Sequence, residues 1–208
     1  LIGFPSVGKS TFLSVVTNAR PEIAAYPFTT IEPNIGVVDL GNEKGFVLAD
    51  MPGLIEGASE GVGLGHDFLR HVERCRFLVH IVDLTQENPM ENYDKINDEL
   101  AKYSDRLANL YQIVALNKID AIDEETKEIY YKQFKEVADD VFLISAATHE
   151  NVDKLTYFMA QKVDEIEKPV SDIVVEEDTG AYDNDDSSFE VIKVAKDAFI
   201  IMGGKLKR

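Results

Sequence analysis

Short apolar segments alternate with longer segments of helical periodicity along most of the chain. Apolar runs predict β-strands at 35–40, 46–49, 77–82, 113–116 and 141–144. Several of these runs are apolar at every position, which is typical of parallel strands covered on both faces. Residues with apolar side chains at spacings of three and four predict helices over 90–107, 130–137 and 152–166. This alternation of strands and helices indicates a three-layer α/β fold.

One strand pair departs from the parallel arrangement. The runs 35–40 and 46–49 are separated only by the five residues 41–45, with glycine at both ends. A parallel crossover needs about a dozen residues, so these two strands must be antiparallel. With Leu1-Ile2-Gly3 as the end of another buried strand, the pattern predicts a mostly parallel six-stranded sheet with one antiparallel edge strand.

The composition divides the chain into three parts. Residues 1–167 form the α/β domain, 168–188 an acidic linker, and 189–208 the start of a small β-containing domain that opens with a hairpin. Because the chain begins inside one strand pattern and ends inside another, we expect a piece of a longer protein.

A phosphate-binding motif occupies the start of the chain. Gly3-Phe4-Pro5-Ser6-Val7-Gly8-Lys9-Ser10 matches G-x-x-x-x-G-K-[ST], between an apolar strand end and a helical run. Glycines let successive amides point at phosphates, and the helix adds the positive end of its dipole. Lys9 is expected to reach the β- and γ-phosphates, and the Ser10 hydroxyl to bind Mg²⁺. Together with the three-layer α/β pattern, the motif predicts a P-loop NTPase fold.

A second motif selects the base. Asn117-Lys118-Ile119-Asp120 follows an apolar strand, at the sheet edge where open α/β sheets bind ligands. The Asp120 carboxylate can accept hydrogen bonds from guanine N1–H and the 2-amino group, and adenine offers neither donor. The stem of Lys118 can cover the base, and Ser145-Ala146-Ala147 can present amides to guanine O6. These residues predict GTP and GDP as ligands.

Two loops are expected to respond to the γ-phosphate. Asp50 ends a strand and can hold Mg²⁺ through water, and the Gly53 amide can touch the γ-phosphate. Upstream, the hydroxyl of Thr30, chosen over Thr29, is expected to complete the Mg²⁺ shell when GTP is bound. Glycines at 57, 61, 63 and 65 predict a mobile loop after Gly53.

Charge and composition exclude several classes of protein. The net charge of −17 argues against non-specific binding to nucleic acid through the chain as a whole. The single Cys75 excludes an internal disulfide, and no apolar run approaches the roughly 20 residues that span a bilayer. We therefore expect a cytoplasmic protein without a membrane partner.

Three stretches resemble the Obg family of bacterial GTPases. They are Gly-Phe-Pro-Ser-Val-Gly-Lys-Ser-Thr at 3–11, Tyr-Pro-Phe-Thr-Thr at 26–30 and Asp-Met-Pro-Gly-Leu-Ile-Glu-Gly-Ala-Ser-Glu-Gly-Val-Gly-Leu-Gly-His-Asp-Phe-Leu-Arg-His at 50–71. The resemblance covers residues 1 to about 166, and 189–208 is similar to the start of the family's C-terminal domain. It implies a role in large ribosomal subunit assembly and stress response, sensitivity to guanosine tetraphosphate, and a monomeric switch. Ser6 stands where some relatives have an Asn linked to potassium activation, and this departure from the family's pattern leaves potassium dependence open.

The motifs and the resemblance together define the expected site. The residues expected to contact the nucleotide are Gly3, Phe4, Pro5, Ser6, Val7, Gly8, Lys9, Ser10, Thr11, Phe28, Thr29, Thr30, Ile31, Glu32, Asp50, Met51, Pro52, Gly53, Asn117, Lys118, Ile119, Asp120, Ser145, Ala146 and Ala147. The expected Mg²⁺ ligands are Ser10, Thr30 and Asp50, and the expected catalytic residues are Lys9, Thr30 and Gly53.

Hydrolysis is expected to be slow. Leu54 stands where the familiar switch GTPases have a water-orienting glutamine, and it has no hydrogen-bonding group. Three alternatives stay open: a P-loop ATPase, against which the intact 117–120 motif speaks, a GTP-sensing scaffold with negligible hydrolysis, and a nucleic-acid-binding module. His66, His71, Glu73 and His80 lack metal-ligand spacing, and Cys75 is expected to be a packed thiol.

Overall fold

The computed structural model describes residues 1–17, 22–23, 34–41, 44–50, 75–103, 105–166, 189–195 and 198–203. The chain divides into two compact units, Leu1–Ser171 and Asp172–Arg208.

A parallel sheet forms the centre of the first unit. Its strands β4 (Leu78–Asp83), β5 (Gln112–Asn117) and β6 (Asp140–Leu143) pair in the order β4-β5-β6. All six residues of β4 are buried, as expected for a parallel strand covered on both faces, and they include the polar residues His80 and Asp83. Ile2 forms a parallel bridge with His80 on the free side of β4, with two backbone hydrogen bonds of 2.9 Å. The first residues of the chain therefore act as a further parallel strand.

An antiparallel sheet lies on the other side of these first residues. Strands β2 (Asn34–Gly41) and β3 (Lys44–Asp50) pair antiparallel, with Val38 opposite Phe46. The Leu1 amino group donates to the Ala49 carbonyl, which places the start of the chain between β3 and β4. The predicted antiparallel pair is confirmed. A two-residue strand, β1 (Glu22–Ile23), pairs with the outer side of β2 and was not predicted, because two residues give no periodicity.

The helices predicted over 90–107 and 152–166 begin within one residue of the predicted positions. Their bounds are α1 Lys9–Val16, α3 Pro89–Tyr103, α4 Asp105–Ala108, α5 Glu124–Lys135 and α6 Val152–Glu165, with a 3-10 turn η2 at Ile119–Ala121. The single helix predicted over 90–107 is two helices. The helix predicted over 130–137 begins earlier, because the Asp123 carboxylate accepts from the Thr126 amide and caps its first turn.

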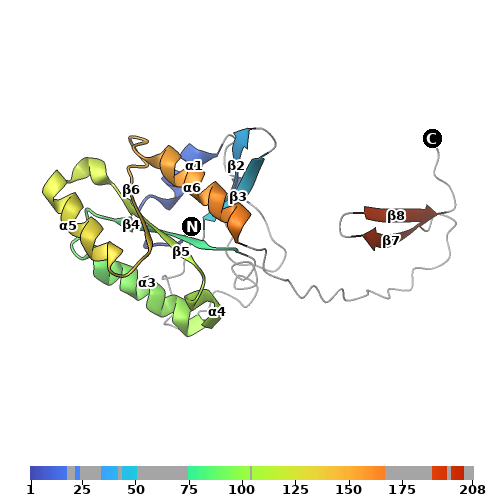
Figure 1. Cartoon of the computed structure of the whole chain (residues 1–208), viewed down its shortest axis with the longest axis horizontal. Helices are drawn as coiled ribbons and strands as arrows, with labels where there is room; N and C mark the ends of the chain where they lie inside the picture. Colours follow the sequence, from blue (N-terminus) through green and yellow to red (C-terminus); the bar gives the residue numbers. More distant parts are fainter. Residues whose placement is uncertain are drawn as a thin grey trace. The chain divides into compact units, whose positions relative to one another are not determined.

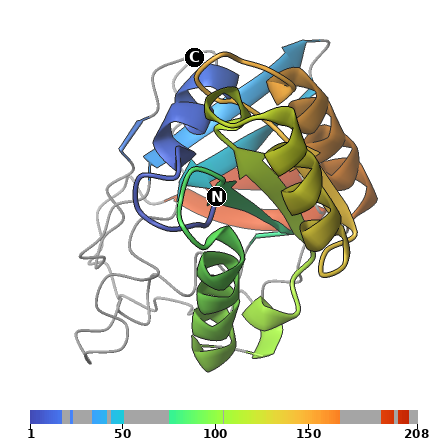
Figure 2. The same cartoon turned by 90° about the vertical axis from the view of Figure 1, so that its left-hand side faces the viewer.

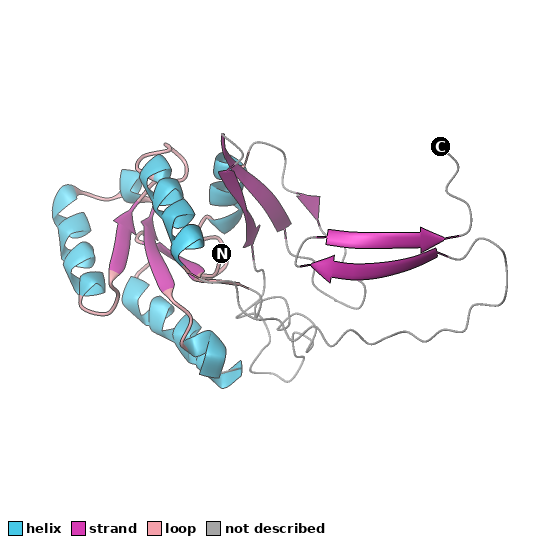
Figure 3. Cartoon of the chain, turned by 45° about the vertical axis from the view of Figure 1, so that its right-hand side comes forward, coloured by secondary structure: helices cyan, strands magenta, loops and turns pink. Residues whose placement is uncertain are grey.

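Helices cover both faces of the sheet, which gives the predicted three layers. Figure 1 shows α1 and α6 on one side and α3 and α4 on the other, Figure 2 shows the same layers from the side, and Figure 3 shows the strands of the parallel sheet between helices. Side chains alternate between two cores along each strand. Val79, Ile81 and Ile113 pack with α1 and α6, while Leu78, Val82 and Val114 pack with the helices of the opposite face.

The second unit contains a β-hairpin. Strands β7 (Phe189–Ala195) and β8 (Ala198–Gly203) pair antiparallel, with a register shift between Lys193 and Ala195. The sequence predicted this hairpin over nearly the same residues. Among the described residues, no helix is long and apolar enough to cross a membrane.

Candidate functional site

The loop at residues 3–8 has the backbone that its glycines predict. Gly3 and Gly8 have positive φ angles of 144° and 105°, and Ser6 lies in the left-handed region with φ 62°. A Cβ atom at Gly3 would lie 2.4 Å from the Ile81 carbonyl oxygen, and one at Gly8 would lie 2.4 Å from Asn117 Nδ2. Both glycines are therefore required by the angle and by the space, and the loop wraps closely around the end of the first strand.

Lys9 opens α1 immediately after this loop. Its ammonium donates to the carbonyls of Gly3 and Phe4, at 2.8 Å and 3.0 Å. The side chain thus folds back along the loop and holds its charge where the loop amides and the N-terminal end of α1 converge. This combination of positive groups suits a phosphate chain.

Ser10 and Asp50 meet across the sheet edge. The Ser10 hydroxyl donates to Asp50 Oδ2 at 2.7 Å, and the carboxylate is only 3% exposed. Asp50 Oδ1 is buried and has no hydrogen-bond partner among the described residues. Hard oxygen ligands with a spare buried lone pair fit a Mg²⁺ ion and its bound water. These two residues could therefore hold the predicted metal.

Asn117 joins the phosphate loop to the loop after β6. Its Nδ2 donates to the Val7 carbonyl at 2.7 Å, and its Oδ1 accepts from the Ala146 amide at 2.9 Å. The side chain is 2% exposed, so both bonds are shielded from water. Asn117 therefore holds three segments together at one edge of the sheet, although Val7 lies 110 residues and Ala146 lies 29 residues away from it in the sequence.

Asp120 lies at the same edge, on η2. It is exposed, and Ser145 donates a 2.5 Å hydrogen bond from its hydroxyl to Asp120 Oδ1. Ser145 is fully buried and its hydroxyl also accepts from the Thr148 amide at 3.1 Å. A buried hydroxyl thus orients an exposed carboxylate toward any ligand at this edge. This arrangement suits recognition of a base with adjacent N–H donors.

Lys118 has a partner that the sequence analysis missed. Its ammonium lies 2.7 Å from Asp83 Oδ2, at the end of β4. Asp83 is in register with Asn117, because β4 and β5 pair in parallel. The sequence could have indicated Asp83, because it directly follows the apolar run 77–82. Asp50 was identified as a candidate from the same feature, since it directly follows the run 46–49.

The remaining predicted residues fall into three groups. Val7, Ile119 and Ala146 have side chains in the core, at 3%, 2% and 2% exposure, so they can offer a ligand only their backbone. Pro5, Thr11 and Ala147 are exposed, and Phe4 is half-buried against the core. Several predicted residues lie outside the described part of the chain: Phe28, Thr29, Thr30, Ile31, Glu32, Met51, Pro52, Gly53 and Leu54.

The other polar candidates lie apart from this edge. His80 is 1% exposed in β4, stacked on Tyr93 with ring centroids 4.8 Å apart. Burial lowers the pKa of His80 from 6.5 to about 3, so the ring is neutral. Cys75 is half-buried, and burial raises the pKa of its thiol. His66, His71 and Glu73 lie outside the described residues, and no group of three metal-ligating side chains occurs among the residues described.

A family model and curated proteins match this chain. The model described as 50S ribosome-binding GTPase matches residues 1–118. The chain is 52% identical to the GTPase Obg of Finegoldia magna over 82% of this chain and 41% of that protein. It is 47% identical to the GTPase Obg of Listeria innocua, over 100% of this chain and 50% of that protein. The chain therefore spans about half the length of the curated relatives it matches.

Solved structures share the fold. Era in complex with MgGDPNP and a segment of 16S ribosomal RNA aligns with a TM-score of 0.56 and 25% identity, over 77% of this chain and 54% of that one. An NFeoB mutant from S. thermophilus bound to GDP aligns with a TM-score of 0.57 and 18% identity, over 81% of this chain and 63% of that one. These similarities confirm the P-loop α/β fold predicted from the sequence.

Proposed function

Because this chain belongs to the 50S ribosome-binding GTPase family, among its Obg members, we propose that residues 1–167 bind GTP and GDP with Mg²⁺ and hydrolyse GTP. One observation carries the proposal. Asn117 bonds to the Val7 carbonyl on one side and to the Ala146 amide on the other, so the phosphate loop and the base-side loops share one edge. A nucleotide with its phosphates at one loop and its base at the other fits this edge.

Guanine is the base that suits the charged group at this edge. Asp120 offers a carboxylate, and guanine presents two adjacent donors to it. Adenine would leave the charge without a partner after removing it from water, which costs on the order of 1–3 kcal/mol. The alternative of an ATPase is therefore disfavoured by Asp120 and by the Ser145 hydroxyl that orients it.

The chemistry is attack of water on the γ-phosphorus with departure of GDP. Lys9, the loop amides and the Gly53 amide are proposed to stabilise negative charge on the phosphoryl oxygens. Ser10, Asp50 and Thr30 are proposed to hold Mg²⁺, which when bound neutralises charge on the β- and γ-phosphates. Leu54 supplies no group to orient water, so we propose slow intrinsic turnover unless a partner completes the site.

Titrations with GDP and ADP test this function directly. We expect GDP to bind about 10- to 100-fold more tightly than ADP, because the adenine edge leaves Asp120 unpaired. Chelation of Mg²⁺ should weaken GTP binding in the natural chain and much less in Ser10→Ala. Equal affinity for ADP, or GTP affinity that ignores both chelation and Ser10→Ala, would contradict the proposal.

Single-turnover assays then separate an enzyme from a sensor. Lys9→Ala should slow GTP cleavage severely, whereas Leu54→Ala should change it less than about tenfold, since charge stabilisation is the main contribution left. Absence of any cleavage above that of free GTP would favour the GTP-sensing scaffold.

The cellular role is proposed from the family. The full-length protein is proposed to act as a switch on the large ribosomal subunit in the cytoplasm, in assembly and stress response. Association of the present chain with the subunit should be weaker, because its net charge of −17 is repelled by RNA phosphates. Co-sedimentation as strong as that of a full-length relative would contradict this. A monomeric state and sensitivity to guanosine tetraphosphate stay predictions.

A further inference from the structure

Asp83 is a buried carboxylate whose role the proposed site does not explain. It ends β4, in register with Asn117, and its side chain is 1% exposed. The backbone continues the contact, because the Leu84 amide donates to the Asn117 carbonyl at 3.1 Å. Asp83 therefore lies beside the base-side motif and not in an unrelated part of the core.

The two oxygens of the Asp83 carboxylate accept hydrogen bonds from different partners. Oδ1 accepts from the Thr85 amide at 2.9 Å and from the Thr85 hydroxyl at 2.7 Å, which forms a tight turn. Oδ2 accepts from Gln86 Nε2 at 3.1 Å and from the Lys118 ammonium at 2.7 Å. Burial alone raises the pKa of Asp83, but the bonds from Lys118 and Thr85 outweigh it, so the pKa is lowered and the carboxylate stays ionised. The turn fixes one oxygen, and the other is directed at Lys118.

Lys118 is held in an unusual conformation. Its backbone is left-handed, with φ 66° and ψ 34°, which few residues with a Cβ adopt. Its side chain is 36% exposed, so without a partner the ammonium would extend into water and carry the stem with it. The ion pair with Asp83 therefore determines where the four methylene groups lie.

We propose that Asp83 is a positioning residue that anchors the Lys118 ammonium, so that the lysine stem stays against the face of the bound base and slows nucleotide release. This inference rests on the proposed nucleotide site. A methylene stem contacts the flat face of a base and not its hydrogen-bonding edge. The anchor should therefore retain nucleotides with different purine edges equally, unlike Asp120, which distinguishes between them.

A double-mutant cycle on nucleotide release tests the anchor. The release of fluorescent GDP is measured in the natural chain, Asp83→Asn, Lys118→Met and the double variant. Lys118→Met keeps an apolar side chain of similar length but removes the ammonium group that pairs with Asp83. We expect Asp83→Asn to speed release about 5- to 20-fold, and to add less than about twofold when Lys118 is already Met. Additive effects would overturn the proposal.

Two further variants separate anchoring from general stability. Thr85→Val removes a bond to Oδ1 but leaves Lys118 its oxygen, so it should lower the thermal midpoint while release changes less than about twofold. If Asp83→Asn does not fold, Asp83→Glu moves the carboxylate instead, and the same cycle applies. Release that follows the thermal midpoint across all variants would overturn the anchor.

The nucleotide series completes the test. Asp83→Asn should speed release of guanosine and inosine diphosphates by the same factor, whereas unequal factors would contradict the role assigned to the stem. If the natural chain does not bind GDP at all, the proposed function fails. If the natural chain binds GDP but the effects of Asp83→Asn and Lys118→Met on release are additive, only the role proposed for Asp83 fails.

Discussion

At the scale of single residues, the base-side carboxylate gives the sharpest prediction. Asp120→Asn should weaken GDP binding about 10- to 100-fold and shift preference toward xanthine nucleotides, because an amide offers a donor that suits a 2-oxo group. The measurement is a pair of titrations with guanosine and xanthosine diphosphates.

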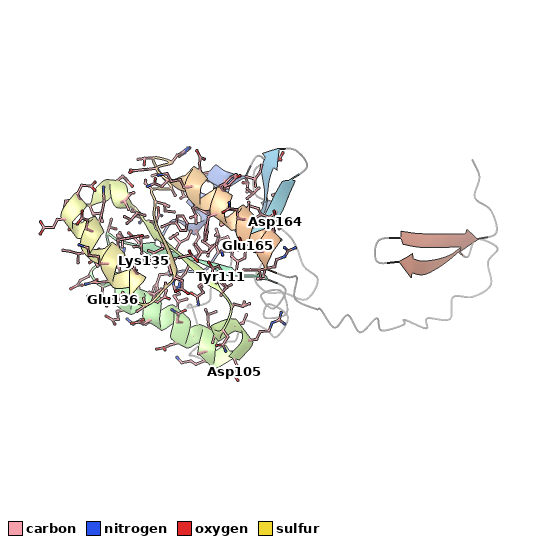
Figure 4. All side chains as sticks on the ribbon, in the orientation of Figure 1. Asp105, Tyr111, Lys135, Glu136, Asp164 and Glu165 are labelled. Carbon is pink, nitrogen blue, oxygen red and sulfur yellow. The ribbon has the colours of Figure 1, made fainter. Side chains whose placement is uncertain are left out.

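The matched control for this variant is Asp164→Asn. Asp164 lies in the last turn of α6, next to Glu165, whose charge acts on Tyr111 just before β5 begins (Figure 4). This variant removes the same charge away from the edge formed by Asn117 and Asp120, so GDP affinity should stay within about twofold of the natural chain. Unchanged GDP affinity in Asp120→Asn would remove Asp120 from the base site.

His80 gives a residue-scale prediction about pH. Its pKa is about 3 in the fold and 6.5 when exposed, because burial disfavours the charged ring. The folded state thus prefers the neutral form, so this stabilisation is complete above pH 6.5 and is lost as the pH falls toward 3. Between pH 7 and pH 5 the loss should be roughly 2 kcal/mol.

Urea unfolding at the two pH values measures this loss. In His80→Leu, which cannot take up a proton, the difference between pH 7 and pH 5 should shrink by about that amount. Exposed Val37, on β2, serves as the control, and Val37→Thr should keep the natural pH dependence because it changes no titratable group. If the free energy of unfolding of His80→Leu fell between pH 7 and pH 5 as much as that of the natural chain, other groups would be the cause.

At the scale of elements, the alternation of buried and exposed residues along β2 predicts opposite outcomes for two adjacent valines. Val38 is 1% exposed and faces the core opposite Phe46, whereas Val37 is 59% exposed opposite Val47. Val38→Thr buries a hydroxyl at constant shape and should lower the free energy of unfolding by about 1–3 kcal/mol. Val37→Thr should change it by less than about 0.5 kcal/mol. Equal losses in urea titrations would contradict the alternation of the strand.

The elements also show how far the sequence could predict the fold. Every long strand was predictable, because a parallel strand buried on both faces is continuously apolar, and the 41–45 turn is too short for a crossover. The beginning of α5 was missed, since its first turn is polar and is determined by the Asp123 cap. Strand β1 was missed because it consists of two residues, too few to show a period, and its pairing with β2 leaves no mark in the sequence pattern.

The local geometry of the candidate site was predictable where a motif fixes the backbone. Gly3 and Gly8 have the positive φ angles and close contacts that the motif requires, and Ser10 meets Asp50 from a distant strand. The partnership of Lys118 with Asp83 was not predicted, because it depends on the register of β4 against β5. The register between two strands is set when they pair in the folded protein, so no spacing of residues along a single sequence reveals it.

At the scale of the whole molecule, the two units differ in what they can contribute to the proposed site. All the described residues of that site lie in the first unit, Leu1–Ser171, and the cores that hold them are formed by residues of the same unit. The hairpin β7–β8 belongs to the second unit. A chain of residues 1–171 should therefore bind GDP within about twofold of the affinity of residues 1–208.

Calorimetric titration and thermal unfolding of the two chains make this comparison. The thermal midpoint of the shorter chain should match that of the longer one within a few degrees, because no described core loses a side chain. Val38→Thr, made in both chains, is an internal control that should lower both midpoints equally, since the substitution acts within the first unit. A GDP affinity that falls tenfold or more on truncation, with the midpoint preserved, would mean that residues 172–208 contribute to binding. In that case the nucleotide-binding domain could not end at residue 167.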